Sequence, residues 1–591
     1  MRLIRNASFA LFAVMIGVAG CSKKKDPDQP LAFAPADTVF LAGNLEALPE
    51  AAIDGWWVNA AQMLPIYENS IDSTLANLDA KDPGSVPAKV LRALREELRG
   101  KFNRAGWQSL GFGSNSSTAI YAIGLVPVLR MELGDADAFR ALVARIEAKS
   151  GAKLDIREVA GQSYWRMLGD DSKAAVVMAV QGQHLVVTLA PAEPSEALLR
   201  QLLGIDRPSS NALESGTLAK FNDETKFLPY GSGYIDFVRL AAALTGERSP
   251  IEQEFLRALG VDAAATAVSP ACRTEYAALA AAVPRLSYGY GALDAKSMDL
   301  RYRLEVAPAQ GKALAGLSAD VPGLDGSGEG LFDFGFALDL DAFAGFVNLR
   351  AAALAAAPFE CESLRELNAG VAKINADLAN PAVFMAGAAV NGFYLSLSQL
   401  ELPEGGAPVV QGKLAVGSDN PQSLLSMAGG FLPQLSALNL QVGAAPVALP
   451  AGLLPPTAPP AHVVLAKNAL AISLGQGEEA GLAAFASAPA GDPSPLLYYG
   501  VDSRGMKVIL EALRRASEAS LATAAAAQGD AQGGSNAQTA AEAGADLEEL
   551  RNAVAILQAV EDSYAESMDR VDFSVYATLQ GIEARYVIDL K

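Results

Sequence analysis

One local pattern recurs three times in this chain and limits the folds open to it: an aromatic strand that ends in aspartate and runs straight into an amphipathic helix. The three aspartates are Asp236, Asp339 and Asp502. Aspartate accepts hydrogen bonds from the first turn of a helix, so we expect each one to be an N-cap. After the first and third instances, alternating apolar and polar residues predict a β-hairpin, over 286–306 and over 571–590.

The segments before these hairpins follow one order in both halves of the chain: a strand, a helix, two further strands and a short helix. The first copy begins with a strand over 118–133 and a helix over 135–151, and the second copy begins at residue 409. Frequent period-2 alternation favours antiparallel pairing over a doubly wound parallel sheet. We therefore predict an α+β fold with two similar repeats, each a mostly antiparallel sheet with helices packed on one face.

Domain boundaries follow from this repetition. We expect a first α+β unit over residues 37–310 and a second over 311–591. Residues 517–546 are of low complexity and rich in Ala, Gln and Gly. This composition predicts a loop within the second unit.

The first 21 residues predict export. Arg2 and Arg5 make the start positive, Ala7–Val18 is a short apolar run, and Cys21 follows two small residues. The apolar run is shorter than the roughly 20 residues that span a membrane, as in a cleaved signal peptide. The stretch Val18-Ala19-Gly20-Cys21 resembles the lipobox of bacterial lipoproteins.

The lipobox resemblance implies that residues 1–20 are removed and that Cys21 carries a diacylglyceryl group and a fatty acid such as palmitate. Two or three acyl chains anchor a protein stably, since each buried methylene adds about 0.8 kcal/mol. Residue 22 is Ser, not the Asp that resembles an inner-membrane retention signal. We therefore expect the cell outer membrane, on its periplasmic face more than on the cell surface. Residues 21–36 are polar and contain Pro, so we predict a tether.

Charge and composition exclude several functions. The chain has 46 basic and 66 acidic residues, a net charge of −20, which repels the phosphates of nucleic acids. Two histidines leave little material for a metal centre, and the motifs HExxH, CxxC and GxSxG do not occur. We predict no nucleic-acid partner, no cofactor, no metal and no identifiable catalytic residue, and we leave enzymatic activity open.

Five residues are candidates for a ligand site. Arg130 and Glu132 are two apart in a predicted strand and so share a face, and Asp135 begins the next helix. A salt-bridged edge or a cap network is the alternative for these three. Trp56 and Trp57 are neighbours in a predicted helix, where they serve either the core or an exposed recognition surface.

The exported part resembles uncharacterised exported bacterial proteins built from duplicated α+β units, and that resemblance implies no activity. Three functions stay open for residues 36–591. The first is a non-catalytic envelope protein that binds an envelope protein partner, or an apolar or cell-wall ligand. The second is a glycan-acting enzyme that uses two carboxylates. The third is a lipid or lipoprotein carrier with a dry apolar cavity.

Cys272 and Cys361 are the two cysteines that remain once Cys21 is lipidated. Compartments outside the cytoplasm permit disulfides, so we predict a Cys272–Cys361 bridge, with two separate thiols as the alternative. Peptide mapping of the exported protein without reductant should recover the two cysteine peptides joined, and reduction should separate them. Two free thiols in the mature protein would contradict the bridge.

Overall fold

The structure, a computed structural model, describes residues 27–168, 172–246, 249–260, 268–378, 390–431, 433–436, 438–450, 452–454, 458–531 and 567–591, with positions 554, 558 and 560. The chain divides into unit 1 (Met1–Ala280, Pro284–Leu300 and Ser517–Ser563) and unit 2 (Ala281–Val283, Arg301–Ala516 and Tyr564–Lys591). The division falls within strand β10 (Ser297–Glu305), before the boundary at residue 310 that the sequence predicted. The predicted signal peptide and Cys21 lie outside the described residues.

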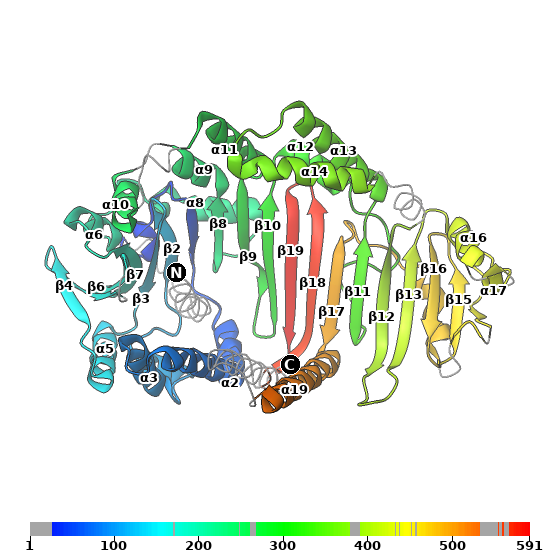
Figure 1. Cartoon of the computed structure of the whole chain (residues 1–591), viewed down its shortest axis with the longest axis horizontal. Helices are drawn as coiled ribbons and strands as arrows, with labels where there is room; N and C mark the ends of the chain where they lie inside the picture. Colours follow the sequence, from blue (N-terminus) through cyan, green and yellow to red (C-terminus); the bar gives the residue numbers. More distant parts are fainter. Residues whose placement is uncertain are drawn as a thin grey trace. The chain divides into compact units, whose positions relative to one another are not determined.

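The fold is α+β, with a large antiparallel sheet (Figure 1). In unit 1 the strands pair in the order β4–β5–β6–β7–β3–β2–β1–β8–β9. Their bounds are β1 Phe40–Gly43, β2 Thr118–Ile123, β3 Val126–Glu132, β4 Asp155–Val159, β5 Gln162–Met167, β6 Ala174–Gln181, β7 His184–Pro191, β8 Ser232–Asp236 and β9 Arg285–Leu293. The stretch 118–133, predicted as one strand, is the hairpin β2–β3, because Gly124 supplies the positive φ of its turn.

In unit 2 the strands pair in the order β14–β15–β16–β13–β12–β11–β17–β18–β19. Their bounds are β11 Phe332–Ala337, β12 Gly392–Glu401, β13 Val409–Gly417, β14 Val447–Ala448, β15 Ala461–Leu465, β16 Ala469–Leu474, β17 Leu497–Asp502, β18 Met568–Thr578 and β19 Gly581–Leu590. Both predicted closing hairpins form, the second as β18–β19.

Helices occupy the connections between strands. Those before β10 are η1 Pro30–Phe33, α2 Glu50–Lys81, α3 Val86–Leu98, α4 Arg104–Ser109, α5 Ala136–Ser150, α6 Glu196–Leu202, α7 Ala212–Ser215, α8 Thr217–Thr225, α9 Phe237–Thr245, α10 Pro250–Leu259 and α11 Pro270–Ala282. Those after it are α12 Pro308–Ala315, α13 Leu340–Ala356, η2 Glu362–Leu364, α14 Arg365–Leu378, α16 Pro421–Phe431, α17 Pro433–Ser436, η3 Glu478–Gly481, α18 Leu482–Phe485 and α19 Ser503–Ala531.

The three predicted aspartate caps are confirmed. Asp236 accepts a hydrogen bond from the Arg239 N–H, Asp339 from that of Ala342, and Asp502 from that of Gly505, at 2.8 to 2.9 Å. Asp236 and Asp502 end strands β8 and β17, Asp339 follows the end of β11 by two residues, and the three residues precede α9, α19 and α13. The recurring sequence pattern therefore marks three places where the chain leaves the sheet as a helix.

Helices cover both faces of the unit 1 sheet, where the sequence predicted one face. Val128 and Val186 belong to a core with η1, α6 and α8, whereas Met131 and Leu185 belong to a second core with α2, α4 and α5. Side chains in a strand alternate between faces, so these two cores lie on opposite sides of β3 and β7. Both faces of these strands carry apolar side chains, so the sequence does not show the alternation of apolar and polar residues that would indicate which face is covered by helices.

The described parts of two predicted connections, residues 27–36 and 517–531, are ordered elements instead. Residues 517–531 continue helix α19, because their alanines favour helix over loop, and 532–546 lie outside the described residues. Residues 27–36, predicted as tether, join unit 1, where Leu31 is 1% exposed and Ala34 is fully buried.

A buried carboxylate joins α3 to α5. Glu97 is 4% exposed and its oxygens lie 2.9 Å from Arg145 Nε and 2.7 Å from Lys149 Nζ. Burial by itself raises the pKa of Glu97, but the hydrogen bonds from Lys149 and Arg145 outweigh it and lower the pKa to about 2. The ionised carboxylate therefore stabilises the folded state of unit 1.

The interaction of Glu97 with Arg145 and Lys149 makes the free energy of unfolding of unit 1 depend on pH. The unfolded pKa of Glu is about 4.3, so the contribution is complete above that value and is lost as the pH falls towards 2. Glu97→Gln should lower the free energy of unfolding by on the order of 2 kcal/mol at pH 7 and by little near pH 2. Urea unfolding followed by tryptophan fluorescence measures unit 1 alone, since all four tryptophans (Trp56, Trp57, Trp107 and Trp165) belong to it.

The neighbouring Glu96 supplies the matched control. Its side chain is 59% exposed and lies 3.8 Å from Lys149 Nζ. Glu96→Gln should change the free energy of unfolding by about 0.5 kcal/mol or less. An equal loss for both variants at every pH would contradict the assignment to Glu97.

Candidate functional site

Arg130 is part of the core of unit 1. Its side chain is fully buried, its Nη2 donates to the Leu203 carbonyl, and its Nη1 lies 3.3 Å from His184 Nδ1. The guanidinium carbon stands 3.6 Å from the centroid of the Phe33 ring, a cation–π contact. Burial lowers the pKa of Arg130. These contacts fix Arg130 in place and leave it closed to solvent.

The other predicted candidates do not gather around Arg130. Asp135 caps α5 by accepting the N–H groups of Asp137 and Ala138 at 2.9 and 3.0 Å, and Glu132 is half-buried at the end of β3. Trp57 is 8% exposed and packs with Trp107, and Trp56 packs against the same core. The cap and core interpretations fit Asp135 and the tryptophan pair better than a shared ligand site.

The two histidines occupy different positions. His184 begins β7 opposite Gln181, whereas His462 lies in β15 opposite Ser473. The two imidazoles therefore lie in different pairing environments. Within the described ranges, no group of three or more His, Cys, Asp or Glu side chains is arranged to hold a metal ion.

Unit 2 places polar side chains in one row across its sheet. Directly opposite residues on neighbouring strands run from Asp572 through Gly500 to Asp333, Ser396, Lys413, Ser473 and His462. Cross-strand neighbours share a face and interact directly. The antiparallel register thus collects on one face polar groups that are far apart in the sequence.

A buried ion network forms one end of this row. Arg570 Nη2 lies 2.7 Å from Asp333 Oδ2, and Arg570 Nε lies 2.9 Å from Asp572 Oδ1. Tyr498 donates its hydroxyl to Asp572 at 2.5 Å, and Tyr394 donates to Asp333 at 3.1 Å. Asp333 is fully buried and Asp572 is nearly so, and these bonds satisfy both carboxylates inside the protein.

The network holds its arginine charged and its two tyrosines protonated, whereas burial raises the pKa of Asp572. Burial and the nearby carboxylates raise the pKa of both tyrosines, so Tyr394 and Tyr498 stay protonated and donate. Burial lowers the pKa of Arg570, but its hydrogen bonds to Tyr498 and Asp333 and the charge of Asp572 outweigh burial and raise that pKa. The guanidinium between these two carboxylates is therefore held in its ionised form.

The same network holds a glycine-rich loop, residues 326–330, over the sheet. Arg570 Nη1 donates to the Gly330 carbonyl at 2.8 Å, and the Gly330 N–H donates to Asp333 Oδ2 at 3.0 Å. A Cβ on Gly328 would stand 2.4 Å from Asp333 Oδ2. Only glycine lets the loop approach the network this closely.

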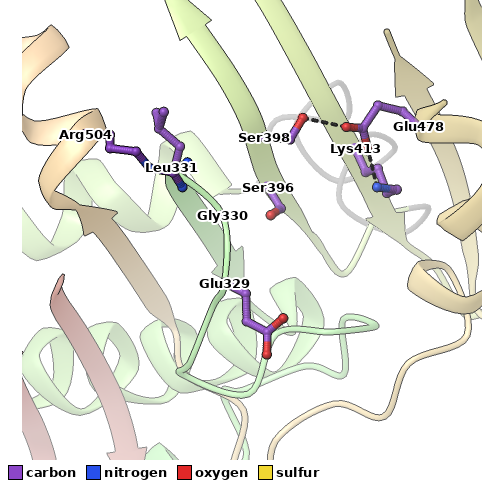
Figure 2. A pocket seen from close by; sticks show the side chains of 8 residues that line it. All are labelled: Glu329, Gly330, Leu331, Ser396, Ser398, Lys413, Glu478 and Arg504. Carbon is purple, nitrogen blue, oxygen red and sulfur yellow. Dashed lines mark hydrogen bonds and ion pairs between the residues drawn. The ribbon is translucent and has the colours of Figure 1, made fainter. Parts of the chain in front are cut away.

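Beside this loop lies an open hollow of about 260 Å³ (Figure 2). All of its lining residues belong to unit 2. They are Glu329, Gly330, Leu331, Ser396, Ser398, Lys413, Glu478 and Arg504. Two of them, Ser396 and Lys413, belong to the polar row, so the row continues from the buried network into the hollow.

The hollow contains a preformed ion pair. Lys413 Nζ binds one oxygen of Glu478, and the Ser398 hydroxyl donates to the other (Figure 2). Burial raises the pKa of Glu478, but the bonds from Lys413 and Ser398 outweigh it and lower that pKa. Glu329 and Arg504 are exposed on the other walls, and Arg504 also pairs with Asp502.

This lining can bind but is poorly suited to acid–base catalysis. It presents carboxylates, an ammonium, a guanidinium and two hydroxyls, which match a ligand that carries charges of both signs and hydroxyl groups. A general acid needs a pKa near the working pH, and that of Glu478 is lowered. The residues of the hollow, and the network behind it, were not among the sequence candidates. The one signal was a charged residue, Asp333, inside the aromatic strand β11.

Comparisons of the chain with protein-family models, with curated proteins and with solved structures find no significant match. Among the described residues, no helix is both long enough and apolar enough to cross a membrane. Cys272 and Cys361 are each disulfide-bonded in the structure, and their pairing with each other stays a prediction. The function of this site is therefore inferred from its own geometry.

Removing Arg570 tests whether the network holds the loop. Arg570→Met leaves Asp333 and Asp572 buried without a cation, which should cost about 3–5 kcal/mol of unit 2 stability. It should also speed hydrogen exchange of the Gly330 amide, which loses its ordered acceptor. Exchange mass spectrometry measures the loop effect over residues 326–331 and the loss of unit 2 stability over strands β11 and β18.

Arg504→Met is the matched control, because it removes an arginine of the same unit that is 72% exposed and paired with Asp502. An exposed pair contributes about 0–1 kcal/mol, so exchange in the loop should stay at the wild-type rate. Equal effects of the two substitutions would show that Arg570 does not hold the loop.

Proposed function

We propose that this chain is a bacterial envelope lipoprotein, anchored through lipid on Cys21, that binds a small polar cell-wall ligand in the hollow of unit 2 and has no catalytic role. The observation that carries the binding part is the lining of the hollow, where Lys413 and Glu478 form an ion pair beside Ser396 and Ser398. Cell-wall fragments carry hydroxyl, carboxylate and ammonium groups, and these groups complement such a lining.

The leader supports the anchoring part. A positive start, a short apolar run and Val18-Ala19-Gly20-Cys21 resemble the lipobox pattern, and Ser22 favours the outer membrane. The net charge of −20 is unsuited to holding the chain on anionic lipid by electrostatics alone. A covalent lipid on Cys21 supplies the attachment that the acidic surface does not.

The alternatives fit the site less well. A lipid carrier needs a dry apolar cavity, whereas the hollow is lined by charges and hydroxyls. A glycan-acting enzyme needs two carboxylates that reach the substrate. Asp333 and Asp572 are instead buried and paired with Arg570. Of the two carboxylates that line the hollow, Glu478 is held by Lys413, which leaves Glu329 exposed without a second carboxylate of the kind such an enzyme needs.

Internal duplication is part of the proposal. The order β6–β7–β3–β2–β1–β8–β9 in unit 1 corresponds to β15–β16–β13–β12–β11–β17–β18 in unit 2. The register agrees as well, since each strand-ending cap lies opposite an arginine, Asp236 opposite Arg285 and Asp502 opposite Arg570. Chance rarely gives the same strand order together with the same register.

Under this correspondence unit 2 has the polar row, and the matching positions of unit 1 do not. Asp333, Ser396 and Lys413 correspond in register to Leu41, Tyr121 and Val128, which are buried in the core of unit 1. Unit 1 thus packs this face as an apolar core, and unit 2 keeps it polar and partly open. We infer that the copies diverged into a packing unit and a binding unit.

Binding is tested with soluble muropeptides released from peptidoglycan by lysozyme, titrated calorimetrically into the mature chain. Wild type should bind them, and the double variant Lys413→Met, Glu478→Gln should bind at least tenfold more weakly. The substitutions remove both charges together and leave neither unpaired. No heat of binding with wild type would contradict the ligand class.

The matched control removes an exposed pair of the same type in unit 2. Lys373 and Asp377 on α14 lie 2.7 Å apart and are 76% and 66% exposed. Lys373→Met, Asp377→Asn should leave affinity within about twofold of wild type, because exposed pairs contribute little. Undiminished binding by the Lys413, Glu478 variant would show that the ligand sits elsewhere.

A further inference from the structure

The first described residues of the chain are built into unit 1. Leu31, Ala32, Phe33 and Ala34 are all at most 5% exposed and belong to the main core of that unit. Phe33 stacks edge-on against His184, with a centroid distance of 5.6 Å, and lies under the Arg130 guanidinium. Pulling this segment out would expose that apolar surface to water, so the docking is part of folding.

Arg207 and backbone hydrogen bonds to residues 210 and 212 also hold the segment 27–36 in place. Arg207 donates to the Pro27 carbonyl at 2.6 Å and to Asp28 at 2.5 Å, and its guanidinium carbon stands 4.3 Å from the Phe33 centroid. The Ala36 N–H donates to the Ser210 carbonyl at 3.1 Å, and the Ala212 N–H to the Ala34 carbonyl at 2.9 Å. The chain is therefore fixed to unit 1 from Pro27 onwards.

This docking leaves a very short link to the anchor. Five residues, Ser22 to Asp26, separate Cys21 from Pro27 in the sequence. Six Cα-to-Cα steps of at most about 3.6 Å span roughly 20 Å when fully extended. A lipid on Cys21 therefore keeps Pro27 within about 20 Å of the membrane interface.

The surface around Pro27 suits that position. It consists of six exposed residues, here called the entry surface: Pro27, Asp28, Asp206, Arg207, Ser209 and Ser210. Both of its carboxylates are paired, Asp28 with Arg207 at 2.5 Å and Asp206 with Arg200 at 2.6 Å. The Arg200 hydrogen bond lowers the pKa of Asp206. In a chain of net charge −20, this surface is close to neutral and can approach anionic headgroups.

We propose that the entry surface of unit 1 faces the lipid headgroups of the membrane that holds Cys21. The inference rests on the proposed lipid anchor and adds to it which surface of unit 1 meets the lipid. The occupant is a phospholipid surface, and Lys23, Lys24 and Lys25 in the linking residues add attraction to anionic lipid. Unit 1 is thereby held at the membrane by its own core and not by a long flexible tether.

The test uses the full lipidated chain in vesicles of phosphatidylethanolamine and phosphatidylglycerol, 3:1. Ser209→Cys carries an environment-sensitive fluorophore, and a fraction of the lipid carries a nitroxide on its headgroup. We expect strong quenching of the fluorophore. A second protein with the same label has 20 Gly and Ser residues inserted between Asp26 and Pro27, which lengthens the reach without touching the docked segment. We expect its quenching to fall by more than half.

Vesicle flotation separates the two claims. If wild type does not float with the vesicles, or if Cys21→Ser floats equally well, the lipid anchor itself fails. If wild type floats but the label at Ser209 is not quenched, the anchor stands and the orientation is overturned. Equal quenching with and without the insertion would overturn the short link as the cause.

Discussion

The antiparallel register of unit 2 is the constraint on which the site depends. Side chains on a strand alternate between faces, so register alone decides which residues meet. It sets Asp333 opposite Ser396 and Ser396 opposite Lys413. A shift of one residue on any of these strands would turn its polar group to the other face and break the row. Strand pairing therefore determines which side chains line the hollow.

Burying an ion network in such a sheet is costly unless every polar atom is paired. Here Arg570 meets two carboxylates, two tyrosine hydroxyls donate to them, and Gly330 supplies both a donor and an acceptor. The network fixes the position of the loop that carries Glu329, beside the pair Lys413–Glu478. Unit 1 has Leu41 and Val128 in its core and no comparable row among its described residues.

Much of the fold could be predicted from the sequence, because local signals are strong. The caps Asp236, Asp339 and Asp502 and the closing hairpins depend on neighbours in the chain. The candidate site could not be predicted, because Asp333, Arg570 and Lys413 come from strands that are distant in sequence, and only pairing brings them together. Arg130 was singled out for its charge, yet its partners Leu203 and Phe33 are a carbonyl and a ring that no motif marks. The tether was predicted too long, because Leu31 and Phe33 are too few to produce a periodic signal.

The proposed location outside the cytoplasm links the disulfide, the ligand and the lipid anchor. An oxidising environment permits a disulfide, a cell-wall ligand is met outside the cytoplasm, and a membrane lies close to Pro27 only if Cys21 is lipidated. The most direct measurement is the mass of the N-terminal peptide of the protein purified from native envelopes. A lipid anchor on Cys21 predicts a peptide that begins at Cys21 and carries a diacylglyceryl group with or without a further acyl chain. A peptide that begins at Met1, or an unmodified Cys21, would contradict it.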